Sequence, residues 1–249
     1  KERYLFEANM RYDGSSKFAD GQKWGIFPSF SAGWRISEEA FWEPLKNVVD
    51  NFKIRGSWGQ LGNQNIGDNY PFSSDVDLNL KYVFNKSVTS GAGITSLANS
   101  LITWETTTVT DLGLDLTLLG KLNFTADYFY KVTDDILLKL NVPLTIGMSA
   151  PQQNAGKVEN RGWDLGINYA NSIGDFNYKL AFNLSDVKNK ILDLKGINET
   201  GLTVSREGEE MFSLFGLEAE GYIVPEDYDA NGKYLYATQY GNFGPGDIK

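Results

Sequence analysis

The stretch 23–36, KWGIFPSFSAGWRI, alternates between two kinds of side chain along its whole length. The even positions carry apolar residues, and the odd positions carry small or polar residues, with Phe27 as the exception. A period of two places successive side chains on opposite faces, which is the geometry of a β-strand and not of a helix. The stretch therefore predicts one long strand with an apolar face and a polar face.

Two tryptophans on the apolar face, Trp24 and Trp34, lie ten residues apart. At about 3.3 Å per residue their separation is roughly 33 Å along the strand. In a strand tilted by about 40° this projects to roughly 25 Å, the height of the apolar band of an outer-membrane barrel with aromatic girdles at both rims. The alternative is a long strand in a soluble β-sandwich.

The composition excludes several classes of protein. The chain has 249 residues, a net charge of −9, no cysteine and no histidine. The negative charge argues against a nucleic-acid partner. Without cysteine or histidine the chain lacks disulfides, the usual zinc ligands and the Ser-His and Cys-His nucleophile pairs. We therefore expect no metal, no cofactor and no enzymatic activity.

The hydropathy is compatible with a membrane barrel but not with a helical membrane protein. No apolar run approaches the ~20 residues that a spanning helix needs. The mean hydropathy of −0.33 agrees with barrel strands, because their alternation averages to a polar value.

The alternation recurs along the chain. Six further segments show it, namely 3–12, 52–58, 104–119, 122–132, 158–169 and 176–185. The segment 210–224 is a candidate eighth strand. Between the second and third strands, Ser37 as an N-cap and Pro44 as an interruption predict a short broken helix that ends near Asp50.

The connections between these strands sort by length. One set of connections is mostly long and comprises 13–23, 60–103, 133–157 and 187 onward. These connections alternate along the chain with a second set, which comprises the link 37–51 and two very short turns at 120–121 and 171–174. Outer-membrane barrels have long loops at one rim and short turns at the other, whereas a soluble sandwich has no reason to sort its loops. We therefore predict an all-β, antiparallel transmembrane β-barrel segment of about seven to eight strands, with a short hairpin near 81–84 inside the second long loop.

Several ordered motifs resemble one known family. RYLFEANMRYDGSSKF is followed by WGIFPSFSAGWRISEEAFW and FKIRGSWGQLGNQNIGDNYPF, and then by TWETTTVTDLGLDLTLL, LNFTADYFYKVTDDILL, NAGKVENRGWDLGINY and GDFNYKLAFNLS. Together they strongly resemble the barrel of SusC/RagA-type TonB-linked outer-membrane transporters. The resemblance covers roughly residues 2–190 well, and 191–249 less specifically.

The resemblance implies a 22-stranded barrel in the cell outer membrane, filled by an N-terminal plug. It implies a SusD-like surface lipoprotein over the extracellular mouth, import driven through TonB, and oligosaccharides or peptides as substrates. No plug, TonB box, signal or closing strand is visible in the sequence, and both ends look cut. We therefore expect 1–249 to be one partial barrel domain from the C-terminal part of a transporter. In it, 191–249 would be mostly extracellular loop with one possible strand.

Three groups of candidate residues follow. Polar residues of the non-lipid face are expected to line the lumen, or to pair with each other or with the plug: Arg3, Glu7, Asn9, Arg11, Lys53 and Arg55. An amide-rich cluster is a candidate sugar-binding surface, or else simple turn chemistry: Asn63, Gln64, Asn65, Asp68, Asn69 and Tyr70. Four tryptophans are interpreted as membrane-interface anchors: Trp24, Trp34, Trp58 and Trp163.

One further motif resembles a metal site. The segment 227–232, DYDANG, resembles the start of a calcium loop, but the twelfth position is Thr238 and not the bidentate Glu. We interpret it as a turn.

The prediction for function is TonB-dependent import of oligosaccharides through the outer membrane. Alternatives are import of peptides by the same machinery, a passive porin or structural barrel, and a soluble carbohydrate-binding β-sandwich. The glycan preference rests on the family resemblance and not on the residues.

Overall fold

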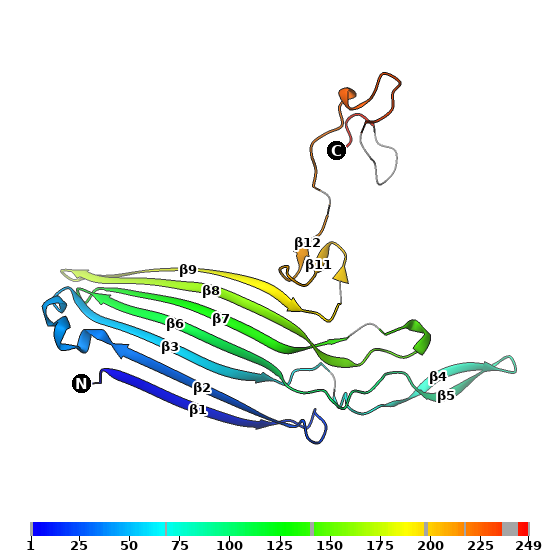
Figure 1. Ribbon diagram of the computed structural model, residues 1–249, viewed down its shortest axis with the longest axis horizontal. Helices are drawn as coiled ribbons and strands as arrows, with labels where there is room; N and C mark the ends of the chain where they lie inside the picture. Colours follow the sequence, from blue (N-terminus) through cyan, green and yellow to red (C-terminus); the bar gives the residue numbers. More distant parts are fainter. Residues whose placement is uncertain are drawn as a thin grey trace.

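A seven-stranded antiparallel sheet forms most of the chain (Figure 1). The computed structural model describes residues 2–67, 69–139, 142–196, 199–216, 218–235 and 244–248. The strand order is β1-β2-β3-β6-β7-β8-β9, so that β1 and β9 are the edges of this open sheet. The strands are β1 (Tyr4–Gly14), β2 (Trp24–Arg35), β3 (Val49–Asn63), β6 (Glu105–Leu118), β7 (Leu122–Lys139), β8 (Gln152–Ile173) and β9 (Phe176–Asp193).

The smaller elements confirm that the connections sort by length. At one end of the sheet, which we call the long-loop rim, lie the hairpin of β4 (Val76–Phe84) and β5 (Ser87–Ile94) and a small sheet of β10 (Glu199–Thr200), β11 (Thr203–Ser205) and β12 (Ser213–Leu214). At the other end, the short-turn rim, Leu118 of β6 and Leu122 of β7 are joined directly by a tight turn. The hairpin predicted near 81–84 is therefore present, and it is longer than expected.

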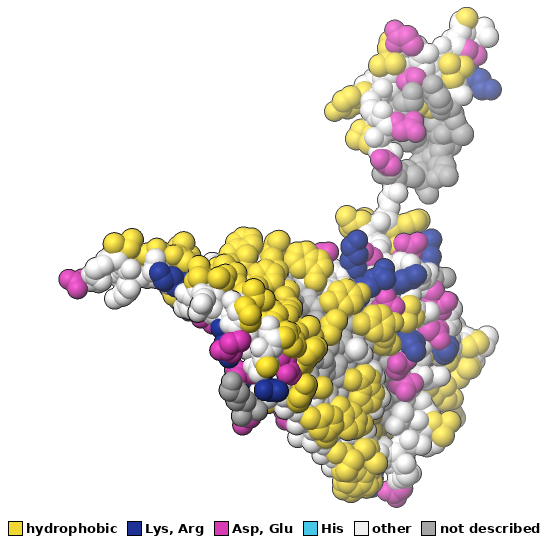
Figure 2. Space-filling view, turned by 60° about the vertical axis from the view of Figure 1, so that its left-hand side comes forward, with side chains coloured by type: hydrophobic (Ala, Val, Ile, Leu, Met, Phe, Trp, Pro, Cys, Tyr) yellow, Lys and Arg dark blue, Asp and Glu magenta, His cyan; other side chains and the backbone are white. Residues whose placement is uncertain are grey.

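The register keeps the two faces of the sheet chemically distinct. Phe30 of β2 lies opposite Trp58 of β3, and Tyr128 of β7 lies opposite Trp163 of β8. These side chains belong to the even positions of β1, β2, β3, β6, β7 and β9 and the odd positions of β8, and we call this the outer face. Figure 2 shows a broad band of hydrophobic side chains over the sheet. Large outer-face residues are exposed, Phe6 by 76% and Trp24 by 61%, as a lipid-facing surface requires and a soluble core does not.

The predicted helix between the second and third strands is wrong in type and length. The segment forms two 3₁₀ turns, η1 (Ile36–Glu38) and η2 (Ala40–Leu45), and β3 already begins at Val49. Ser37 lies inside η1 and makes no capping hydrogen bond; its hydroxyl is buried. Pro44 lies within η2, where the absence of a proline N–H favours a short tight turn over a continuous α-helix.

Two other boundaries are corrected. The turn predicted at 171–174 lies at 174–175, because β8 continues to Ile173, and Gly174 adopts a φ of +59°. β9 continues to Asp193, well beyond the point where its apolar pattern loosens. Strands that rise above a membrane lose the apolar side chains but keep the backbone ladder, so sequence alternation underestimates their length.

The candidate eighth strand is absent from the described part of 210–224, which contains only the two-residue β12. Just before this segment the chain folds back on the end of β9, where the backbone N–H of Ile191 donates to the carbonyl of Glu209 and that of Gly208 donates to the carbonyl of Ile191. In the segment 227–232, an oxygen of Asp229 accepts from the backbone of Asn231 and Lys233, which is turn chemistry. Among the described residues, no group of acidic side chains has the arrangement of a metal site.

A compact apolar cluster at the long-loop rim holds the loops against the sheet. Phe18, Phe27, Ile66, Ile102 and Trp104 are all buried. They come from three loops and from β2, where Phe27 points away from the apolar outer face. The described residues contain no helix of the length and apolarity needed to span a membrane.

Candidate functional site

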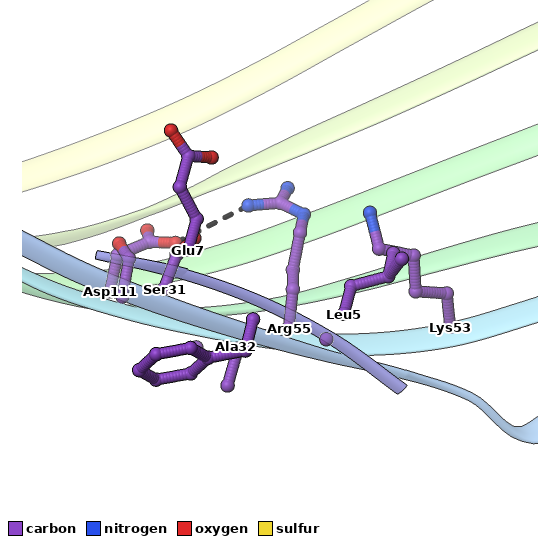
Figure 3. A pocket seen from close by; sticks show the side chains of 11 residues that line it. Leu5, Glu7, Ser31, Ala32, Lys53, Arg55 and Asp111 are labelled. Atoms are coloured by element: carbon purple, nitrogen blue, oxygen red, sulfur yellow. Dashed lines mark hydrogen bonds and ion pairs between the residues drawn. The ribbon is translucent and has the colours of Figure 1, made fainter. Parts of the chain in front are cut away.

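The inner face of the sheet carries a polar hollow of about 530 Å³ between β1, β2, β3 and β6 (Figure 3). Its wall includes Glu7, Ser31, Lys53, Arg55 and Asp111. In Figure 3 Glu7, Lys53 and Arg55 project to one side of the strands, while Ala32 projects to the other. The alternation that makes the outer face apolar therefore delivers a charged inner face from the same strands.

Arg55 is the centre of an ion-pair network on this face. Its guanidinium lies 3.3 Å from Asp111, 3.4 Å from Asp115 and 2.6 Å from Asp127. Lys53 adds a contact of 3.4 Å with Asp115. Two cations thus face three carboxylates, which leaves the group with an excess of negative charge. All five side chains are about one-fifth to one-third exposed, so solvent weakens each pair without removing it.

Glycine makes the reach of Arg55 possible. In the register across the sheet, Gly113 of β6 lies between Arg55 of β3 and Asp127 of β7. A Cβ at position 113 would lie 2.4 Å from both Cζ of Arg55 and Oδ1 of Asp127. The guanidinium therefore crosses β6 through the space that the missing side chain leaves.

A fourth carboxylate extends the group of Asp111, Asp115 and Asp127, because Asp164 of β8 lies directly opposite Asp127 of β7. Like charges opposite one another destabilise a sheet, and the ion pair of Arg55 with Asp127 offsets the repulsion between Asp127 and Asp164. The inner face consequently carries paired charges with a surplus of carboxylates, and these groups can donate and accept hydrogen bonds.

The remaining predicted lumen residues lie on β1 or just before it. Glu7 accepts a hydrogen bond of 2.7 Å from Asn9, and Arg11 pairs with Asp13 at 2.6 Å. These pairs are exposed on the inner side of the edge strand, whereas Arg3 lies apart from them at the short-turn rim.

Arg3 belongs to a network around Glu39 that joins β1, β2 and the link to β3. The carboxylate of Glu39 accepts from the hydroxyl of Tyr4 at 2.8 Å, from the indole of Trp34 at 3.2 Å and from Arg3 at 3.2 Å. These donors, the Tyr4 hydroxyl first, hold the pKa of Glu39 below its ordinary value.

The amide-rich cluster divides into two parts. Asn63 ends β3, donates to Glu105 at 3.3 Å and accepts from the backbone of Asn65 at 2.9 Å. This part is turn chemistry, although Gln64 and Asn65 remain exposed. Asn69 and Tyr70 instead line a separate hollow of about 280 Å³, together with Ser73, Ser96 and Gln152. Asp68 lies outside the described residues.

The four predicted anchor tryptophans all lie on the outer face. Trp24 and Trp34 occupy the two ends of β2, where they stack on Tyr12 and Tyr4 with ring centroids 4.8 and 6.5 Å apart. Trp58 stacks on Phe30 at 6.1 Å, between those two levels. Trp163 lies opposite Tyr128. An anchoring role for them remains a prediction.

Sequence reasoning missed the partners of Arg55 and the rim cluster. Asp111, Asp115 and Asp127 lie on the polar face of their strands, as the alternation indicates, but only the register of β3 with β6 places them beside Arg55. Phe27 carried a visible signal, since it is the one large apolar residue on the polar face of its own strand. Trp104 carried none, because only the folded loops bring it to Phe27.

Comparison with known proteins agrees with this geometry. The family model described as "TonB dependent receptor-like, beta-barrel" matches residues 1–247. A TonB-dependent receptor of Formosa agariphila is 33% identical over 268 residues, covering 100% of this chain and 25% of that protein. TonB-dependent receptor SusC of Bacteroides thetaiotaomicron is 33% identical, covering 96% of this chain and 24% of SusC.

Among solved structures, the RagAB peptide importer in its open-open state matches with a TM-score of 0.78 at 21% identity, over 96% of this chain and 27% of that one. Its closed-closed state gives a TM-score of 0.76 at 22% identity, over 96% and 28%. The chain spans about a quarter of the length of the curated relatives. With one face apolar, the other polar, and the family match running from end to end, the chain belongs to the TonB-dependent receptors of SusC type and forms part of their outer-membrane β-barrel.

Proposed function

We propose that the protein containing this chain imports oligosaccharides across the outer membrane, using energy delivered through TonB. A SusD-like surface lipoprotein would cover the long-loop rim and deliver the substrate. The plug that TonB acts on would come from a part of the protein outside this chain. The chain's own contribution is a section of barrel wall and of the extracellular mouth.

The observation that carries this proposal is the polar hollow at Arg55 on the inner face of a sheet whose outer face is apolar. A passing substrate needs hydrogen-bonding groups that hold it weakly and at many points, so that it can leave again. Paired charges such as Arg55 with Asp127 supply such groups without the strong attraction of an isolated ion. The inner face would serve as a transit surface.

The hollow beside Asn69 and Tyr70 supports a glycan substrate. Its wall is mostly neutral and polar, with Ser73, Ser96 and Gln152 as hydroxyl and amide groups. Amides and hydroxyls match the uncharged hydroxyls of sugars, and the exposed ring of Tyr70 offers a stacking surface. Capture would begin at this rim, before the substrate reaches the Arg55 hollow.

Peptide import is the second candidate. The RagAB structures are those of a peptide importer, and their likeness to this chain concerns the fold. Backbone amides of a peptide would also find donors and acceptors at the rim. Uptake of a labelled oligosaccharide set and a labelled peptide set by cells that express the full-length protein distinguishes the two.

The test of energy coupling is uptake in matched strains with and without TonB. We expect uptake to fall to the background of a strain that lacks the transporter when TonB is removed. Undiminished uptake without TonB would instead support a passive porin. Surface levels of the full-length protein, measured by antibody on intact cells, must be equal in the two strains.

A further inference from the structure

Three cations gather on the outer face at the point where the apolar band ends. On β8, successive outer-face residues toward the long-loop rim are Leu165, Trp163 and Arg161. Their cross-strand partners on β9 are Leu184, Asp186 and Lys188, and Lys190 follows on the same face. Figure 2 shows Lys and Arg side chains, with acidic ones among them, beside the hydrophobic band near the base of the C-terminal segment.

The arrangement places two cations directly against each other. Arg161 of β8 is the cross-strand partner of Lys188 of β9, and Lys190 lies two residues further along the same face, opposite Glu159. Like charges directly opposite in a sheet are destabilising. A cross-strand Arg–Lys pair therefore costs free energy unless an anion lies between the two.

The neighbouring carboxylates do not neutralise this group. Glu159 approaches Arg161 only to 3.8 Å and accepts a hydrogen bond of 3.0 Å from Tyr130. Asp186 lies beside Lys188 on the same face, opposite Trp163. Within the described part of the chain, neither Lys188 nor Lys190 has an ion-pair partner, and both side chains are exposed. Three cations thus face two carboxylates, in a chain whose overall net charge is −9.

The position of the group identifies its ligand. Trp163 lies one outer-face position below Arg161 on β8, and Tyr130 of β7 lies directly opposite Arg161. Aromatic residues of this kind mark the level of lipid headgroups. Basic residues just outside an apolar membrane segment attract anionic headgroups, and an arginine holds phosphate by two parallel hydrogen bonds. We propose that Arg161, Lys188 and Lys190 bind the phosphate groups of the phosphorylated glycolipid in the outer leaflet.

Native mass spectrometry of the full-length transporter in detergent tests this. The probes are lipid A with its phosphates and the same lipid after removal of the phosphates. Each lysine near an anionic surface contributes roughly five-fold in affinity, so Lys188→Gln with Lys190→Gln should weaken binding of the phosphorylated lipid by roughly 25-fold. Binding of the dephosphorylated lipid should not change.

The matched control changes two exposed lysines of the inner face, Lys131→Gln with Lys179→Gln. It removes the same charge from the inner face of β7 and β9, away from the basic group, and should leave lipid binding as in the wild type. A Lys188→Arg with Lys190→Arg variant should restore binding, which separates loss of charge from loss of fold.

Two results would overturn the proposal. One is an unchanged preference for the phosphorylated lipid in the double glutamine variant. The other is equal binding of both lipids by the wild type, with the basic group occupied by free inorganic phosphate alone. Because lipid binding is measured on purified protein, failure of the import proposal would leave this result unaffected.

Discussion

At the scale of the residue, Arg55 shows how a barrel wall can hold charge without offering it to a single ligand. Its guanidinium contacts three carboxylates on two neighbouring strands. The contact with Asp127 of β7 requires the space at position 113 of β6, because a Cβ there would clash with both Arg55 and Asp127. The residues of each ion pair can be recognised in the sequence as polar-face residues, and Gly113 provides the space in which Arg55 reaches Asp127.

We predict that Gly113→Ala displaces Arg55 from Asp127 while the barrel still folds. The two clashing atoms, at 2.4 Å, are the ends of flexible side chains, so these move and the backbone does not. Loss of one partly exposed pair should lower the free energy of unfolding by about 1 kcal/mol. Denaturant unfolding of the full-length protein measures this.

The control for Gly113→Ala is Gly56→Ala. Position 56 lies on the neighbouring strand, and a Cβ there meets only a backbone oxygen at 3.8 Å. We expect it to be nearly neutral. An equal loss of stability in both variants would mean that the effect comes from glycine in a strand and not from the passage of Arg55.

A second residue-scale prediction concerns Glu39, whose pKa is lowered by the Tyr4 hydroxyl, the Trp34 indole and Arg3. A carboxylate with a depressed folded-state pKa stabilises the protein above its unfolded pKa, and this contribution disappears as the pH falls through the folded value. The wild type should therefore exceed Glu39→Gln in stability near neutral pH, with the difference closing below about pH 4.

Unfolding of both proteins across pH 3–7 measures that difference. Glu2→Gln removes the same charge from an exposed side chain near the same rim and should match the wild type at every pH. A gap between wild type and Glu39→Gln that stays constant with pH would assign the effect to packing of the side chain and not to its ionisation.

At the scale of the element, strands were predictable because one physical demand acts on every second residue. Lipid on one face and water on the other imposed the alternation in β2 from Trp24 to Arg35. The same demand explains the errors. Above the membrane, water bathes both faces, so the ends of β8 and β9 carry no alternation although their backbone ladder continues. The link after Arg35 faces no lipid, and its 3₁₀ turns follow from local contacts.

The inner-face site was predictable in composition but not in pairing. The alternation of apolar and polar residues predicted that Lys53 and Arg55 lie on the polar face, whereas their ion-pair partners depend on the register between β3, β6 and β7. The register between β6 and β7 follows from the tight turn that joins them, whereas β3 and β6 are joined by a long loop whose length carries no signal of pairing. The rim cluster was beyond prediction, because Trp104 and Phe18 meet only through loop folding.

The element-scale prediction concerns Phe27, which anchors that cluster. Its ring packs edge-on against Trp104 at 5.5 Å, and it is 5% exposed. Phe27→Ala should weaken the closure of the rim loops by roughly 3 kcal/mol. We expect hydrogen exchange in 64–66 and 102–104 to become much faster, while exchange in the strands at the membrane level stays slow.

Phe30→Ala is the matched control, since Phe30 lies on the same strand but faces outward and is 46% exposed. Its loss should leave exchange in the rim loops unchanged. If both variants accelerate the loops alike, the cause would be a general loosening of β2 and the cluster would have no specific anchoring role.

At the scale of the whole molecule, the sheet separates three surroundings with one set of strands. The outer face meets lipid, the inner face carries the polar and charged side chains, and the long-loop rim carries the loops that the import proposal places at the mouth. The β4–β5 hairpin projects away from the sheet at this rim (Figure 1). Tyr82 and Phe84 lie on the same face of the hairpin and are each 71% exposed. An isolated two-stranded hairpin is marginally stable in water, so this one is expected to gain its order from a partner or a substrate.

The hairpin can be removed without touching the wall. Val76 and Ile94 are cross-strand partners, so deletion of 76–94 leaves two ends that already lie side by side. The rim cluster keeps Ile66, Ile102 and Trp104, which a deletion of the whole loop 60–103 would disturb.

We predict that the shorter deletion lowers substrate uptake by the full-length transporter at least ten-fold, because capture at the mouth is lost. The amount of folded barrel in the outer membrane should stay the same, as read from heat-modifiable migration on gels. A parallel fall in folded barrel would assign the hairpin to assembly, and undiminished uptake would remove it from the capture step.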